Sequence, residues 1–169
     1  MSVNTSWICD AYYDIVDVME PIFKSYTPKN NFFGSVVTIK CFEERGSILD
    51  VLRSDGEGKV LVIDGGASLR CSIVDEAIVA LAAQNGWEGL VINGAVRDVD
   101  ELQKYDVAVL ALGSHPVLAP DDSNGVDDVP VHFGGISIYA GDYLYADSTG
   151  VVISSEPLDL ALNKQESDD

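Results

Sequence analysis

EGLVINGAVRDVDELQKYDVAVLALGS, residues 88–114, holds two apolar runs separated by a short charged segment. The runs 88–95 and 106–114 are rich in valine, leucine and isoleucine, which is typical of strands buried on both faces of a sheet. The segment 99–104 between them predicts a short helix. A strand, a helix and a second strand in this order indicate a parallel α/β layer.

The same alternation extends toward the N-terminus. Strands are expected at 35–42 and 59–66, and the segment GSILDVLRSDGEG (46–58) predicts a short helix that ends in a glycine-containing loop. A longer helix is expected at 76–85. Further upstream, residues 6–19 place apolar side chains at steps of three and four, which predicts an amphipathic helix.

The C-terminal part has a different pattern. Residues 120–128 are polar and predict a loop, and 129–155 form short apolar runs punctuated by glycine pairs and turn residues, which predicts a series of short strands. We therefore expect one α/β domain over residues 1–162, followed by a disordered acidic tail at 163–169.

Charge excludes one class of partner. The 169 residues include 28 Asp and Glu but only 10 Lys and Arg, so the formal net charge is -18. Because nucleic-acid affinity rests mainly on cations that displace counterions, direct binding of RNA or DNA is not expected. The chain has no apolar run that could cross a membrane and no basic and apolar leader, so a cytoplasmic protein is expected.

Several common sites are missing from the sequence. The glycines of VIDGGASLR (62–70) do not fit GxGxxG and indicate a tight turn after a strand, and neither a P-loop nor a GxSxG elbow is present. Cys9, Cys41 and Cys71 have no zinc-ligand spacing and are expected to be small buried thiols.

Two pairs of charged residues stand at the ends of neighbouring predicted elements. Arg97-Asp98 comes directly after the strand 88–95, and Asp75-Glu76 stands where the helix 76–85 begins. A surface salt bridge explains the first pair, and helix capping with an acidic first turn explains the second. Both pairs, however, are expected at the edge of the sheet where α/β proteins bind ligands, so they can share one cleft.

The residue types suit an anionic substrate and a metal ion. With Asp75 as the N-cap, the backbone N–H groups of Glu76, Ala77 and Ile78 can bind a carboxylate. Arg97 adds a fixed cation with two parallel donors. The carboxylates of Asp98 and Glu76 can act on a metal ion. Asp98 offers an oxygen ligand to Mg²⁺, and Glu76 can hold the water molecules that the ion keeps.

Six stretches carry a resemblance to a known family. They are CDAYYDIVDVMEPIF, TIKCFE, KVLVIDGGASLR, NGWEGLVINGAVRDVDEL, HFGGISIYAGDYLYAD and TGVVIS. Over nearly its full length the chain resembles the family called regulator of ribonuclease E activity A. This family is similar to the class II pyruvate aldolases that act on 4-hydroxy-4-methyl-2-oxoglutarate. The resemblance implies a swivelling β/β/α domain, of the phosphohistidine-domain type, assembled as a ring-shaped homotrimer.

The resemblance also implies two functions. The active aldolases carry an acidic residue, twenty intervening positions and then Arg-Asp, and Glu76, Arg97 and Asp98 match this pattern. That match implies Mg²⁺-dependent cleavage of a 2-keto acid, with oxaloacetate decarboxylation as a side activity. The alternative is a protein regulator that binds ribonuclease E; such regulators tend to lack the Asp that this chain has at 98. The longer aldolases carry a C-terminal extension that supplies an acid to a neighbouring subunit, and this sequence shows none.

Overall fold

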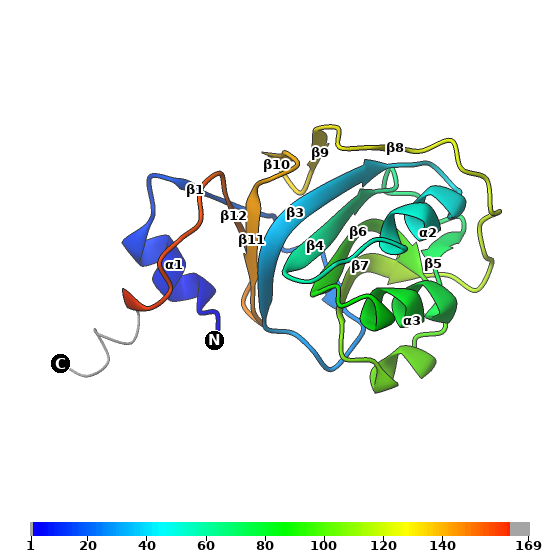
Figure 1. Ribbon diagram of the computed structural model, residues 1–169, viewed down its shortest axis with the longest axis horizontal. Helices are drawn as coiled ribbons and strands as arrows, with labels where there is room; N and C mark the ends of the chain where they lie inside the picture. The colour runs from blue at the N-terminus through cyan, green and yellow to red at the C-terminus, as the bar shows by residue number, and fades with distance from the viewer. Residues whose placement is uncertain (1, 163–169) are drawn as a thin grey trace.

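The centre of the molecule is a sheet of apolar parallel strands. In this computed structural model, which describes residues 2–162 (Figure 1), all eight residues of β6 (Gly89–Val96) are buried. Parallel pairing joins β6 to β4 (Lys59–Asp64) on one side and to β7 (Ala108–Ser114) on the other, and β4 to β3 (Phe32–Lys40). The strands predicted at 59–66, 88–95 and 106–114 are confirmed to within two residues at each end, and the one predicted at 35–42 begins three residues earlier.

The remaining elements extend this centre. The main sheet runs β1-β12-β11-β3-β4-β6-β7-β2, with β5 paired to β6 and β8 paired to β3, while β9 and β10 form a separate hairpin. The bounds of these strands are β1 (Val16–Val18), β2 (Lys24–Ser25), β5 (Ser72–Val74), β8 (Val126–Asp127), β9 (Val131–Phe133), β10 (Ile136–Ile138), β11 (Tyr143–Ala146) and β12 (Val151–Ser154). The helices are α1 (Thr5–Ala11), α2 (Gly46–Leu52), α3 (Glu76–Gln84) and the 3₁₀ turn η1 (Glu101–Lys104).

Each face of the sheet buries its own core. Because successive side chains of a strand point to opposite faces, Leu61 and Ile63 pack toward α2 and α3, and Val60 and Val62 pack toward β9 and β10. Figure 1 shows α2 and α3 side by side over the parallel strands. The molecule is therefore the mixed α/β single domain that the sequence predicts.

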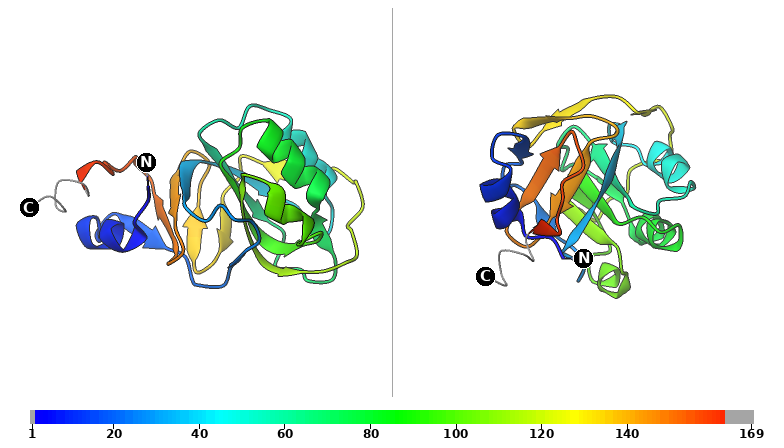
Figure 2. Two further views of the ribbon diagram at one scale, coloured as in Figure 1. Left: turned by 90° about the horizontal axis from the view of Figure 1, so that it is seen from below. Right: turned by 60° about the vertical axis from the view of Figure 1, so that its left-hand side comes forward.

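A third cluster of buried residues lies outside the antiparallel part of the sheet. Ile8 of α1 packs with Tyr145 and Val152 of the β11–β12 hairpin, and Leu160 closes the cluster. Figure 2 shows α1 and the last described residues beside these strands. The cluster attaches both ends of the described chain to the sheet edge.

The helix predicted over 6–19 is wrong beyond residue 11. Helix α1 ends at Ala11, and after a turn the chain forms β1, which pairs antiparallel with β12. The segment from Ile15 to Met19 contains three β-branched residues, which favour a strand, and pairing with β12 satisfies its backbone groups. Ile15, assigned to the buried helix face, is 53% exposed.

Smaller differences occur elsewhere. The helix at 76–85 is confirmed as α3, the short helix within 46–58 as α2, and the strands predicted within 129–155 as β9 to β12. The loop predicted at 120–128 includes β8, and the helix at 99–104 is only a 3₁₀ turn. Strand β5 was not predicted. The tail at 163–169 lies outside the described residues, and none of the described helices is long and apolar enough to cross a membrane.

Candidate functional site

The two predicted charged pairs lie side by side at the carboxyl ends of the parallel strands. Strand β5 pairs with β6 so that Val74 is opposite Val96, and the backbone N–H of Arg97 donates to the carbonyl of Val74 at 3.0 Å. Arg97-Asp98 therefore emerges beside Asp75-Glu76, where α3 begins. This confirms the expected common edge, although the strand that aligns the two pairs, β5, was not foreseen.

Asp98 is attached to the N-terminus of α3. Its Oδ2 accepts a hydrogen bond from the backbone N–H of Glu76 at 3.0 Å, and its own carbonyl accepts from the N–H of Leu102 at 3.0 Å. Its backbone has a φ of 58°, a conformation that Asp and Asn adopt more readily than most residues. The side chain stays 36% exposed, so the carboxylate is fixed in direction and still open to solvent.

Arg97 lies between Asp98 and the chain that follows β7. Its Nε is 3.8 Å from Asp98 Oδ2, and its Nη1 donates to the carbonyl of Pro116 at 3.4 Å. The Nε atom is buried and has no hydrogen-bond partner among the described residues. The Asp98 carboxylate offsets part of the charge of Arg97 but lies too far from Nε for a hydrogen bond, so the guanidinium keeps donor capacity at this edge.

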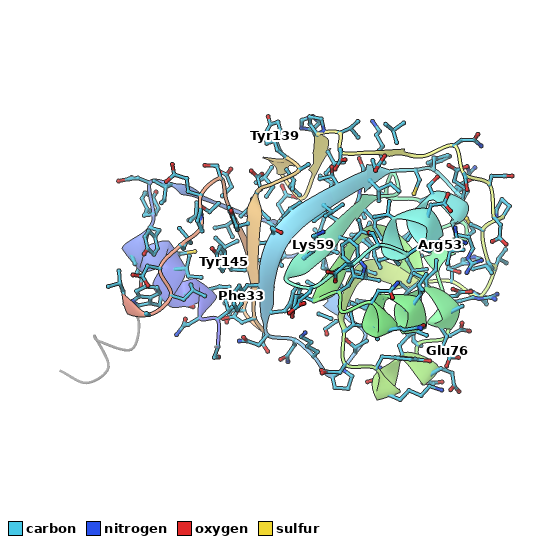
Figure 3. All side chains as sticks on the ribbon, in the orientation of Figure 1. Phe33, Arg53, Lys59, Glu76, Tyr139 and Tyr145 are labelled. Atoms are coloured by element: carbon cyan, nitrogen blue, oxygen red, sulfur yellow. The ribbon has the colours of Figure 1, made fainter. Side chains whose placement is uncertain are left out.

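Glu76 points toward η1. Its Oε1 accepts from Lys104 Nζ at 2.8 Å and from Tyr105 Oη at 2.9 Å, and Figure 3 labels it at the start of α3. The hydrogen bond from Lys104, and then that from Tyr105, lowers the pKa of the Glu76 carboxyl, which is therefore ionised at neutral pH. No pattern in the sequence indicates Lys104 or Tyr105, because their approach to Glu76 depends on how η1 turns back toward α3.

The three backbone donors predicted to bind a carboxylate are partly engaged by the chain itself. Asp75 is the N-cap of α3, as predicted, and its Oδ1 accepts from the N–H of Ile78 at 3.1 Å. The N–H of Glu76 is bonded to Asp98. Of the three amides, only that of Ala77, an exposed residue, has no acceptor among the described residues. The helix end thus offers one amide to a substrate while the other two orient carboxylates.

A buried arginine that the sequence did not reveal supports this helix end. Arg45 precedes α2, its side chain is 9% exposed, and its Nη2 lies 3.0 Å from Asp75 Oδ1. Its Nη1 lies 2.5 Å from Asp121 Oδ1. Asp75 therefore caps α3 and neutralises Arg45 with the same oxygen. Residues 45 and 75 belong to different crossovers, and only the assembled sheet brings them together.

A second polar group follows the next strand of the sheet. Asp64, at the end of β4, accepts from Asn93 Nδ2 of β6 and from the N–H of Gly66, both at 3.0 Å. Gly66 has a φ of 68°, so the glycines after β4 form the tight turn that the sequence predicts. A hollow of about 400 Å³ lined by Phe42, Asp64 and Gly66, among others, opens beside this turn.

The donors suit a metal ion that keeps most of its water. The described residues contain no group of three or more His, Cys, Asp or Glu side chains arranged to hold a metal. Asp98 offers Oδ1, because Oδ2 is bonded to Glu76, and its exposure leaves room for water. Mg²⁺ often binds proteins through one or two carboxylates together with water and substrate oxygens, so Asp98 fits such a site and does not fit a closed cage.

The fold and the site define an α/β protein with a cation, an open carboxylate and a helix end at the carboxyl edge of a parallel sheet. The chain matches the RraA-like (Aldolase/RraA) family over residues 5–153 and belongs to that family. The structure supports this at the level of the whole fold, as three solved structures show.

The first is the RNA-processing inhibitor RraA of Thermus thermophilis, with 33% identity, a TM-score of 0.90, and coverage of 95% of this chain and 97% of that one. A Geobacillus kaustophilus structure described as an S-adenosylmethionine:2-dimethylmenaquinone methyltransferase has the same identity and TM-score, with 95% and 98% coverage. RraAS2 of Streptomyces coelicolor, an unusual member of the RNase ES inhibitor RraA family, has 22% identity and a TM-score of 0.76, with 98% and 85% coverage, and shows the fold alone.

Proposed function

We propose that this protein is a divalent-metal-dependent lyase for 2-keto acids. The proposed reaction is retro-aldol cleavage of 4-hydroxy-4-methyl-2-oxoglutarate to two molecules of pyruvate, with decarboxylation of oxaloacetate as a side activity. The observation that carries the proposal is the placement of Arg97 and Asp98 beside the start of α3, with Arg97 Nε 3.8 Å from Asp98 Oδ2 and Asp98 Oδ1 free of hydrogen bonds among the described residues. Glu76, Arg97 and Asp98, the residues that the resemblance implies for the reaction, lie together at this edge of the sheet.

The proposed chemistry needs charge stabilisation more than a covalent group. In the cleavage, the bond between C3 and C4 breaks, its electron pair passes into the enolate of pyruvate, and the C4 hydroxyl loses its proton as its carbon becomes a ketone. Decarboxylation of oxaloacetate leaves the same enolate. A Mg²⁺ ion held by Asp98 would supply a Lewis acid that stabilises the developing enolate.

The chain's own residues have three roles in this scheme. Arg97 binds the substrate carboxylate and offsets the negative charge of the enolate, which is worth most where the donor is already desolvated. The N–H of Ala77 adds a second donor to that carboxylate. Glu76, kept ionised by Lys104 and Tyr105, accepts the hydroxyl proton through a water molecule and returns one to the enolate carbon.

Pyruvate release from each substrate, measured through NADH oxidation by added lactate dehydrogenase, tests the proposal. We expect turnover with Mg²⁺, loss of turnover with EDTA and its return when Mg²⁺ is added in excess. Arg97→Lys keeps a charge but not the two parallel donors, so turnover should fall by about 100-fold. Turnover that EDTA leaves unchanged, or an Arg97→Lys protein as active as the original, contradicts the proposal.

A second candidate function rests on one comparison. The Thermus protein that is 33% identical to this chain is described as an RNA-processing inhibitor. A regulator of this kind would bind ribonuclease E through the acidic surface, without contacting RNA. Immobilised protein should then retain ribonuclease E at low salt and release it as salt shortens the screening length, and Arg97→Lys should leave retention unchanged. No retention at low salt, together with 2-keto acid turnover, would leave the lyase alone.

A further inference from the structure

Strand β1 is an open edge of the main sheet. It is the first strand in the sheet order and pairs only with β12 among the described strands. The N–H of Met19 donates to the carbonyl of Val151. In an antiparallel pair, the backbone N–H and C=O groups of successive residues point alternately toward and away from the partner strand. The backbone groups of Asp17 therefore also point toward β12, and those of Val16 and Val18 point outward. Figure 1 places β1 at the end of the molecule opposite α3 and the site described above.

Apolar side chains are exposed along this edge. Tyr13 is 81% exposed, Ile15 53% and Val18 52%, and the three lie within six residues of one another. Free backbone groups beside exposed apolar side chains form the kind of edge to which another strand adds, and natural proteins usually protect such an edge with lysine or proline. Neither residue occurs within β1.

The charge around the edge has a single sign. Residues 1–23 contain four acidic residues, Asp10, Asp14, Asp17 and Glu20, and no Lys, Arg or His. None of the ion pairs among the described residues involves them. The charge of this edge is therefore uncompensated within the described chain, and it favours a cationic partner.

A hollow of about 530 Å³ continues the edge where β1 ends. Its apolar wall includes Val18, Phe23 and Leu110, and its only charged lining residues are the acids Glu20 and Asp147. An apolar hollow with carboxylates at its rim suits a side chain that has an apolar stem and a cationic head, which describes lysine and arginine.

We propose that β1 and this hollow bind an extended basic segment of another protein. The segment adds as a strand to the outward groups of Val16 and Val18, covers Ile15, and places a lysine or arginine stem in the hollow with its charge near Glu20. The inference does not depend on the lyase proposal, because none of these residues belongs to the Arg97-Asp98 site.

Fluorescence anisotropy tests the proposal on the full chain. The probe is a fluorescein-labelled nine-residue peptide of alternating lysine and valine, and the control peptide replaces each valine by proline, which keeps the charge but removes the backbone donors of a strand. We expect saturable binding of the lysine-valine peptide at low salt, and binding of the lysine-proline peptide at least tenfold weaker.

Matched variants locate the binding. Asp17→Asn/Glu20→Gln should weaken binding by about three- to tenfold, because two charge pairs near the surface are lost. Glu57→Gln/Asp106→Asn removes the same charge elsewhere and should change it less than twofold. Val18→Pro removes an outward N–H and should abolish binding, whereas Val18→Thr should not. Circular dichroism and thermal melting check that each variant folds. If the proline variant fails to fold, the Asp17→Asn/Glu20→Gln variant still tests the edge.

Several results would overturn the proposal. They are no binding of the lysine-valine peptide, equal binding of both peptides, or equal losses from the two charge variants. If Val18→Pro or Asp17→Asn/Glu20→Gln instead breaks an oligomer of the protein, the edge is occupied by a second copy of this chain and not by a basic segment.

Discussion

Asp98 combines three features in one residue. It adopts a left-handed backbone conformation, accepts a hydrogen bond from the first amide of α3, and leaves one oxygen open. Asparagine tolerates the same conformation and can accept the same hydrogen bond, but it carries no charge. Substitution by asparagine therefore separates the structural role of Asp98 from its proposed role as a metal ligand.

We expect Asp98→Asn to abolish Mg²⁺-dependent pyruvate release while changing the free energy of unfolding by less than about 0.5 kcal/mol. Asp98→Ala should also abolish turnover and cost about 1 to 2 kcal/mol, because the amide of Glu76 loses its acceptor and alanine is strained at this φ. Urea denaturation and the coupled assay measure the two effects. An active Asp98→Asn protein would remove this residue from the reaction.

Arg45 gives a prediction about stability. It is almost completely buried against Asp75, so Arg45→Met leaves a buried carboxylate without its cation and should lower the free energy of unfolding by about 3 kcal/mol. Arg53 pairs with Asp50 on the exposed side of α2, where both side chains are more than half exposed (Figure 3). Arg53→Met should therefore cost less than about 0.5 kcal/mol. Equal losses in the two variants would show that the Arg45 pair contributes no more than a surface contact.

These residues mark how far the sequence predicts the site. Arg97 and Asp98 come after a predicted strand, and Asp75 and Glu76 stand at the start of a predicted helix, so knowledge of the sheet edge was enough to group them. Arg45 lies in another crossover, and its contact with Asp75 depends on strand order and on the path of the loop through Asp121. No spacing in the sequence encodes such a contact, and the same holds for Lys104 and Tyr105 around Glu76.

At the scale of elements, the parallel strands were predictable and the N-terminal segment was not. Buried parallel strands are short, continuous apolar runs rich in β-branched residues, and the runs in this sequence have both features. Residues 6–19 instead fit a helix by their three- and four-residue steps, whereas the β-branched residues Ile15, Val16 and Val18 favour a strand. Pairing with β12 decided between them, and that partner lies more than 130 residues further along the chain.

Helix α1 depends on a carboxylate of the β11–β12 turn. Asp147 accepts from the hydroxyl and the backbone N–H of Thr5, at 2.6 and 2.8 Å, and from the N–H groups of Thr149 and Gly150. Burial acts to raise the pKa of Asp147, but these hydrogen bonds outweigh it and hold the pKa below its usual value. The ionised form is therefore favoured by folding.

This gives a pH dependence of known sign. Because the folded-state pKa is depressed, the stability that Asp147 contributes is present above the unfolded pKa of about 3.9 and is lost as pH falls through the lower folded value. Asp147→Asn should lower the free energy of unfolding by about 1 to 2 kcal/mol at pH 7, and the difference should shrink below pH 4. Urea denaturation across this range measures it. A difference that does not vary with pH would mean that the charge of Asp147 is unimportant.

At the scale of the whole molecule, exposed apolar side chains gather beside the candidate site. Phe42, Leu69 and Val117 are each more than half exposed, although they follow buried strands. The Phe42 ring lies close to Gly66, and Leu69 lies close to Gly113, so both border the turn after β4 and the end of β7. Exposed apolar side chains near one another can serve as a contact surface between proteins.

We expect this surface to be covered in a homotrimer, which the family resemblance implies. A neighbouring chain that packs on Leu69 and Val117 would lie within reach of Arg97, so the site would border two subunits and a second chain could close it to water. Light scattering after size exclusion should give the mass of three chains at micromolar concentration.

Leu69→Asp places a charge in the contact and should give a monomer with reduced turnover, because desolvating an unpaired carboxylate is costly. Tyr139→Asp changes a side chain of similar exposure, 50% against 53%, on another part of the surface and should leave the trimer intact. A monomeric original protein contradicts the assembly, and a Leu69→Asp protein that remains a trimer moves the contact away from the site.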